Sequence, residues 1–167
     1  MTRSYRKGSV GALMDEYERA ATELKSVLKL IDQESYAAIL DKETQDPDCK
    51  SIRTIMNHVV GAGYGYANYI RIQFNEPLKE RNESYETDTP ELACSEIELM
   101  LKYNIETLEN KWEMTDEDIM KNIMKVRWGP SYDVEQLLEH AIVHILRHRR
   151  QIEKLFVISS TIDAHPI

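Results

Sequence analysis

Three histidines at intervals of four most constrain how this chain can fold: His140, His144 and His148. They lie in residues 133–156, DVEQLLEHAIVHILRHRRQIEKLF, which contain no Gly or Pro. Because an α-helix turns once in 3.6 residues, side chains four apart stand above one another on one face. Asp133 and Gln136 have the spacing of an N-cap and its capping-box partner. The sequence therefore predicts a helix over 133–156 with imidazoles along one side.

The three imidazoles point in different directions on a helical wheel. With His144 at zero and about 100° per residue, the apolar side chains gather between roughly 20° and 100°. This stripe contains Val134, Leu137, Ala141, Ile145, Ile152 and Leu155. His148 falls inside the stripe at about 40°, His144 on its edge, and His140 just outside at about −40°. We therefore expect two imidazoles to face the interior and His140 to stand at the rim.

Imidazoles that face an interior need partners, because a buried polar ring without a hydrogen bond costs about 1–3 kcal/mol. A divalent metal would satisfy them, since histidines at i and i+4 can bind one ion from one helix face. The three residues between His144 and His148 include no carboxylate, whereas the zinc-protease motif has Glu after its first His, so we exclude a protease. The alternative is that these are core histidines bonded to carboxylates or carbonyls.

Composition limits the partners and the compartment. The 167 residues suffice for one domain with a sizeable core, which we expect to span 1–167. The net charge of −8 argues against nucleic acid or an anionic membrane as partner. Two cysteines, Cys49 and Cys94, form no disulfide framework and fit a reduced, cytoplasmic setting. No apolar run approaches the length of a membrane span.

Apolar side chains at helical spacing predict three further helices: 10–31, 51–74 and 90–112. Ser9 is a candidate cap of the first, and Thr89-Pro90 has the pattern of an N-cap followed by the first helical position. Connections are predicted at 32–50, 75–89 and 113–132, the second long enough to cross over between helices that are not hairpin neighbours. Residues 123–128 are expected to be extended, and 159–167, which include His165, to be a loose tail.

His58 borders the apolar side of the helix predicted at 51–74. A lone histidine there is more often a core residue than a ligand, but His144 and His148 make it a candidate third ligand. Three glycines follow it closely: Gly61, Gly63 and Gly65. Each costs a helix roughly 1 kcal/mol relative to Ala. Their presence indicates either a close approach of another helix or room for a ligand beside His58.

Two segments, SIRTIMNHVVGAGYGYANYI around His58 and LLEHAIVHILRHRRQI ending at Ile152, resemble the DinB/YfiT-like metalloenzyme superfamily. The second is similar to the histidine helix of that family, including Arg149 and Gln151 after its last histidine. The likeness in helix order and length covers most of the chain. The resemblance implies an all-α fold, a four-helix bundle of up-down-down-up type with long crossover connections, often as a homodimer. It also implies that zinc or nickel is bound by His58, His144 and His148.

The resemblance implies a function as well, because characterised relatives include transferases that use low-molecular-weight thiols. Three protein ligands leave an open position for water or substrate, as catalytic zinc requires. A thiol-dependent S-transferase or a hydrolase acting on a small molecule would fit. His140 and Gln151 are candidates for supporting contacts to the ligands, although His140 could equally be a rim histidine without chemistry. The alternative is a non-catalytic binding or structural bundle, with hydrogen-bonded core histidines or a structural metal that has a fourth protein ligand.

Overall fold

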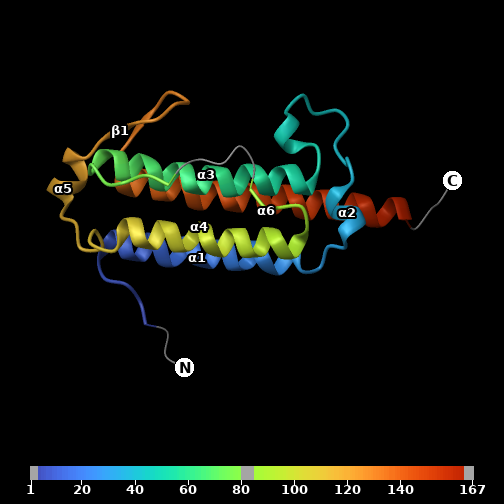
Figure 1. Ribbon diagram of the computed structural model, residues 1–167, viewed down its shortest axis with the longest axis horizontal. Coiled ribbons are helices and arrows are strands. Elements are labelled where there is room, and N and C mark those ends of the chain that lie inside the picture. The colour runs from blue at the N-terminus through green and yellow to red at the C-terminus, as the bar shows by residue number, and fades with distance from the viewer. Residues whose placement is uncertain (1–3, 80–84, 164–167) are drawn as a thin grey trace.

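The computed structural model describes residues 4–79 and 85–163, and helices dominate them (Figure 1). Four long helices lie side by side: α1 (Gly8–Leu28), α3 (Ile52–Gln73), α4 (Pro90–Leu108) and α6 (Val134–Asp163). The short elements are α2 (Gln33–Ala37), the 3-10 helix η1 (Pro47–Cys49), α5 (Asp116–Lys121), β1 (Met124–Lys125) and β2 (Ser131–Tyr132). Two strands of two residues each are the only strands in the described part of the chain, so the all-α prediction is confirmed.

The directions of the four long helices determine which of them meet. In Figure 1 the colours show α1 and α6 running one way and α3 and α4 running the other. α6 packs against both α1 and α3, and α3 also packs against α4. Since α3 and α4 run in the same direction, the connection between them has to return to the end where α3 began. Within the described residues, no helix combines the length and the apolar composition needed to cross a membrane.

The apolar stripe predicted on the last helix is buried as expected. None of its six members is more than 5% exposed: Val134, Leu137, Ala141, Ile145, Ile152 and Leu155. Full burial of an aliphatic side chain contributes about 1.5–3 kcal/mol, so a rotation of α6 that exposed this stripe would be strongly unfavourable. The stripe therefore fixes the direction in which the histidines of α6 point.

Three predicted helix starts are confirmed by their capping hydrogen bonds. The amide of Gln136 donates to Asp133 Oδ1 at 2.8 Å, and the amide of Asp133 donates to Gln136 Oε1 at 3.2 Å. Thr89 caps α4, and Pro90 takes the first helical position. Ser51 and Thr54 form a reciprocal capping box on α3. These local contacts satisfy amide groups that the first helical turn leaves without partners.

Other predicted boundaries were wrong. α1 begins at Gly8 after the N-cap Lys7, so Ser9 lies inside the helix rather than capping it, and α1 ends at Leu28. α4 ends at Leu108 instead of 112, and turns follow it. The predicted tail is helical to Asp163, because no Gly or Pro precedes that point to end the helix. His165 lies outside the described residues.

The predicted extended segment 123–128 is only partly a strand. β1 pairs with β2 in an antiparallel hairpin, with Met124 opposite Tyr132. Gly129 has φ +118°, a conformation that favours glycine and allows the chain to reverse. The hairpin packs on α3 and α6, and it carries Arg127 and Trp128 close to its turn. The β1–β2 hairpin, for which the sequence suggested no role, thus lies beside the two helices that carry the histidines.

Candidate metal centre

The three histidines predicted as ligands lie together, although they come from two helices. His58 projects from α3, and His144 and His148 project from α6. One ligand nitrogen of each lies within 4.8 Å of the others. The Nε2 atoms of His58 and His144 are 3.0 Å apart. No other His, Cys, Asp or Glu of residues 4–79 and 85–163 joins this group, so the three imidazoles form a compact cluster with three nitrogen donors.

Hydrogen bonds behind two of the rings fix their tautomers. His58 Nδ1 lies 3.1 Å from Asp48 Oδ2, and because an ionised carboxylate only accepts, this Nδ1 carries the proton. His148 Nδ1 lies 3.0 Å from Gln151 Oε1 and donates to it, because an amide oxygen only accepts. In a neutral imidazole the other nitrogen is then unprotonated. The Nε2 atoms of His58 and His148 therefore each carry a lone pair that can bind a cation.

Burial keeps two of the three rings neutral. Loss of water contact, reinforced by the neighbouring imidazoles, lowers the pKa of His144 to about 3. Burial also lowers the pKa of His148, which is only 9% exposed. Metal binding requires a deprotonated ring nitrogen, and a ring with a depressed pKa offers one at neutral pH. His144 and His148 can thus accept a cation without first losing a proton.

The glycines of α3 serve two separate purposes. A Cβ at Gly63 would lie 2.4 Å from Met100 Sδ, so that glycine allows α4 to approach α3 closely. A Cβ at Gly65 would meet nothing within 4 Å. Gly65 lies on the wall of a cavity of about 680 Å³, together with His58 and His144. Close packing and room for a ligand, which the sequence left as alternatives, therefore both occur.

The cavity opens beside the cluster between α3, α6 and the hairpin. Its lining residues are Asp48, Asn57, His58, Gly61, Ala62, Gly65, Tyr66, Asn68, Tyr69, Ile72, Tyr85, Arg127, Trp128, His140 and His144. His148 is not among them and lies deeper. Burial raises the pKa of the Tyr66 phenol, so this hydroxyl stays protonated. A small molecule in the cavity would meet two of the three clustered imidazoles.

His140 stands apart from the cluster, and Gln151 is joined to it. The His140 ring stacks on Trp128 with 5.3 Å between ring centroids, and its centroid lies 6.4 Å from that of His144. Its Nδ1 is 3.5 Å from the Tyr132 hydroxyl. Gln151 contacts His148 directly through the hydrogen bond already described. Their supporting roles in chemistry remain predictions.

Sequence reasoning missed Asp48, Arg127, Tyr66 and Tyr85. Asp48 falls in the connection predicted at 32–50, and its carboxylate orients His58. Pro47 and Asp48 fall in η1, which packs on α3 and so brings this carboxylate to the ring. Residues in loops have no periodicity to reveal their direction, so only Tyr66 had a detectable signal, eight residues after His58 on the same helix.

The comparison with family models agrees with this arrangement. The model of the DinB family matches residues 1–156, which include all three clustered histidines. No curated protein and no solved structure matches the chain. The match therefore identifies the family without supplying a relative whose reaction could be carried over.

Proposed function

The chain belongs to the DinB family, and from this premise we propose that it is a metal-dependent enzyme acting on a small molecule. One divalent ion would be held by His58, His144 and His148. The observation that carries the proposal is the convergence of their ligand nitrogens to within 4.8 Å, at the wall of a cavity large enough for a substrate. A substrate in that cavity would lie next to the bound ion.

The donor set fits a borderline metal. Imidazole nitrogens suit zinc and nickel, whereas magnesium and calcium prefer oxygen. The Asp48 carboxylate accepts a hydrogen bond from His58 Nδ1 and does not belong to the ligand group. Three nitrogen ligands without a fourth among the described residues favour a catalytic site over a closed structural one.

The proposed reaction is thiol-dependent S-transfer or hydrolysis, with a low-molecular-weight thiol as a second substrate in the first case. A divalent ion in this position would act as a Lewis acid and lower the pKa of a water or thiol. The residues of the chain then have three tasks. Asp48 orients His58, and Gln151 orients His148. The cavity wall, which includes Tyr66, holds the substrate, and Tyr66 stays neutral there.

A second candidate is a non-catalytic bundle with hydrogen-bonded histidines. It is favoured by one observation: His58 has a partner at each ring nitrogen, Asp48 at 3.1 Å and His144 at 3.0 Å. Against it stands the position of His58 and His144 at the wall of a sizeable cavity. Hydrogen-bonded core histidines need no such space beside them.

The finer architecture is part of the same proposal. We assign the four long helices to a single four-helix bundle of up-down-down-up order, which the helix directions in Figure 1 support. We also propose that the protein works in the cytoplasm, as a homodimer. Sedimentation at micromolar concentration tests the dimer, and a monomer at all concentrations would remove it.

Elemental analysis tests the metal site. Protein purified without added metal is expected to contain zinc or nickel at about one ion per chain, and His144→Ala is expected to lose it. Arg150→Ala, on the exposed side of α6, is the matched control and should keep the metal. Wild-type protein that neither contains nor takes up a divalent ion would exclude the enzyme and leave the hydrogen-bonded bundle.

A further inference from the structure

The outer part of the cavity is aromatic. Trp128 lies within 6.0 Å of Tyr66 and 5.8 Å of Tyr69, measured between ring centroids, and its plane is steeply inclined to both. Its indole is nonetheless 44% exposed, and Ile72 on the same wall is 58% exposed. Apolar surface left in water at the mouth of a cavity favours a ligand that covers it. Aromatic rings are covered best by a flat group, through stacked or edge-to-face contacts.

The floor of the cavity is made of small residues. Gly61, Ala62 and Gly65 follow His58 on one face of α3, and Tyr69 and Ile72 continue that face. At a rise of about 1.5 Å per residue, the floor from His58 to Tyr69 is roughly 16 Å long. The Tyr85 ring covers the floor at Gly61, where an added Cβ would lie 3.2 Å from it, whereas nothing lies within 4 Å of a Cβ at Gly65. A flat molecule can therefore lie over Gly65, beside the ring of Tyr85.

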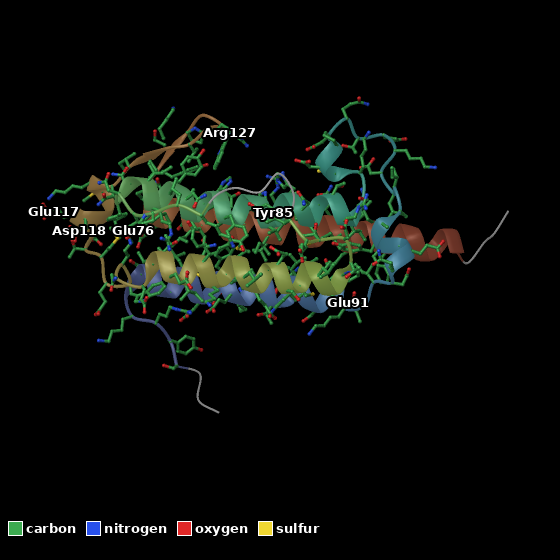
Figure 2. All side chains as sticks on the ribbon, viewed as in Figure 1. Glu76, Tyr85, Glu91, Glu117, Asp118 and Arg127 are labelled. Carbon is green, nitrogen blue, oxygen red and sulfur yellow. The ribbon has the colours of Figure 1, made fainter. Side chains whose placement is uncertain are left out.

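The charges in the cavity wall are arranged at opposite ends. Arg127 is the only Lys or Arg side chain in the described lining, and no described carboxylate forms an ion pair with it. Its backbone amide donates to the Tyr69 hydroxyl at 2.9 Å, which anchors the hairpin backbone at the far end of the floor. Figure 2 shows Arg127 on the hairpin. Asp48 lies at the other end, beside His58. An anionic group would be attracted to the Arg127 end and repelled from the Asp48 end.

We propose that this cavity binds a planar small molecule that carries a carboxylate or similar anion. The anion pairs with Arg127, the flat part lies along the glycine floor against Trp128 and the tyrosines, and the opposite end reaches His58 and His144. That this molecule is the substrate rests on the proposed function, but its binding does not. Arg127 is then a specificity-determining residue supplied by the hairpin.

Calorimetric titration with three matched probes tests the proposal: 2-naphthoate, uncharged 2-naphthamide and non-aromatic cyclohexanecarboxylate. We expect 2-naphthoate to bind at least tenfold more tightly than either of the others, because only it offers both the plane and the charge. The protein is used as purified and after EDTA treatment, so that direct coordination of the carboxylate by a metal is separated from pairing with Arg127.

Two variants and a control complete the test. Arg127→Gln should reduce 2-naphthoate affinity about tenfold and leave 2-naphthamide unchanged, whereas Arg150→Gln, an exposed arginine outside the cavity, should change neither. Gly65→Leu should weaken both naphthyl probes at least tenfold with an unchanged circular dichroism spectrum, since its side chain enters open space. An anion preference that persists in Arg127→Gln after EDTA treatment overturns the proposal, as does equal binding of all three probes.

The two proposals fail separately. Protein without metal affinity that still shows Arg127-dependent binding of 2-naphthoate would end the enzyme proposal and keep this one. Protein that holds zinc or nickel but binds 2-naphthoate no better than 2-naphthamide would end this one alone.

Discussion

Gly63 and Gly65 lie two residues apart on α3, yet their surroundings predict opposite effects of the same substitution. Gly63→Ala would drive a methyl group into Met100, which is fully buried and accepts hydrogen bonds from Tyr17 and Asn104 through its sulfur. We expect it to lower the free energy of unfolding by about 1–3 kcal/mol. Gly65→Ala should raise it by about 0.5–1 kcal/mol, because Ala is the better helix former and nothing obstructs its methyl group.

Urea unfolding of the two variants, measured with wild type under the same conditions, checks this pair. Equal effects at the two positions would mean that α3 and α4 do not approach as closely as described. A loss of stability at Gly65 would mean that the space beside it is filled.

His144 gives the stability of the metal-free protein a dependence on pH. Its folded-state pKa of about 3 lies below the ordinary value of 6.5, so the unfolded chain binds a proton between these values and the folded chain does not. The contribution of His144 to the free energy of unfolding is therefore fully present above about pH 6.5, and it is lost as pH falls toward 3. Between pH 7.5 and 5.0 we expect a loss on the order of 1–2 kcal/mol in EDTA.

The measurement is chemical denaturation at both pH values, with His144→Gln as the comparison. The variant lacks the titrating ring. The difference in its free energy of unfolding between pH 7.5 and 5.0 should therefore be smaller than that of wild type by about 1–2 kcal/mol. If wild type and His144→Gln show the same dependence on pH, the ring is not buried as described.

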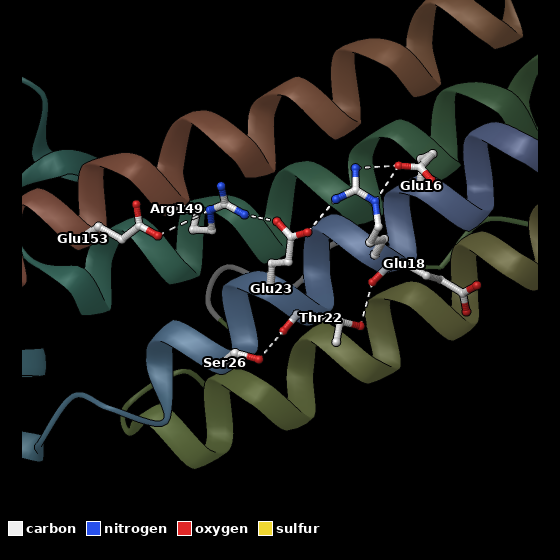
Figure 3. A network of polar contacts seen from close by, with 8 residues as sticks. Glu16, Glu18, Thr22, Glu23, Ser26, Arg149 and Glu153 are labelled. Carbon is white, nitrogen blue, oxygen red and sulfur yellow. Dashed lines mark hydrogen bonds and ion pairs between the residues drawn. The ribbon is translucent and has the colours of Figure 1, made fainter. Parts of the chain in front are cut away.

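At the scale of helices, a chain of charges joins α1 to α6 beside the cluster. Arg149 pairs with Glu23 on α1 and lies 3.5 Å from Glu153 on its own helix. Glu23 also pairs with Arg19 at 2.5 Å, and Arg19 in turn pairs with Glu16 (Figure 3). Because Arg149 follows His148 directly, this contact helps to hold the segment of α6 that carries two of the three histidines.

We expect Arg149→Met to lower the free energy of unfolding by about 1 kcal/mol, the upper range for a partly exposed ion pair. A double-mutant cycle with Glu23→Gln, measured by urea unfolding, should give a coupling of about 0.5–1 kcal/mol. Metal content should stay that of wild type, since the methionine stem keeps the packing of the helix. A coupling near zero would show that the contact between α1 and α6 depends on apolar packing alone.

On the scale of the whole molecule, the cluster links two helices that are far apart in sequence. His58 and His144 come from α3 and α6, and an ion held by both can bind only when the two helices are packed together. Free zinc at a hundredfold excess over its Kd should therefore raise the free energy of unfolding by about 2.7 kcal/mol.

Thermal unfolding with and without zinc measures this increment. His58→Ala and His144→Ala should each abolish most of it, although they lie on different helices. An undiminished increment in His58→Ala would mean that the ion is bound by α6 alone.

Local rules account for what could be predicted from the sequence. The i, i+4 spacing of His140, His144 and His148 and the apolar stripe beside them give both the last helix and the directions of its rings, since helical periodicity is a property of neighbouring residues. Caps such as Asp133 with Gln136 mark helix starts for the same reason. The wheel placed His148 inside and His140 at the rim, and the structure has both there.

The tertiary structure alone decided which side chains meet around those rings. Asp48 reaches His58 because η1 packs on α3. Arg127 and Trp128 reach the cavity because the short β1–β2 hairpin packs on α3 and α6. Neither segment has a periodic pattern, and their positions depend on contacts with residues distant in the chain. The sequence by itself determined the helices and the faces that they bury, because these follow from interactions within a few residues. The cavity, its charge at Arg127 and the convergence of His58 with α6 needed the packed molecule, because packing of distant segments sets them.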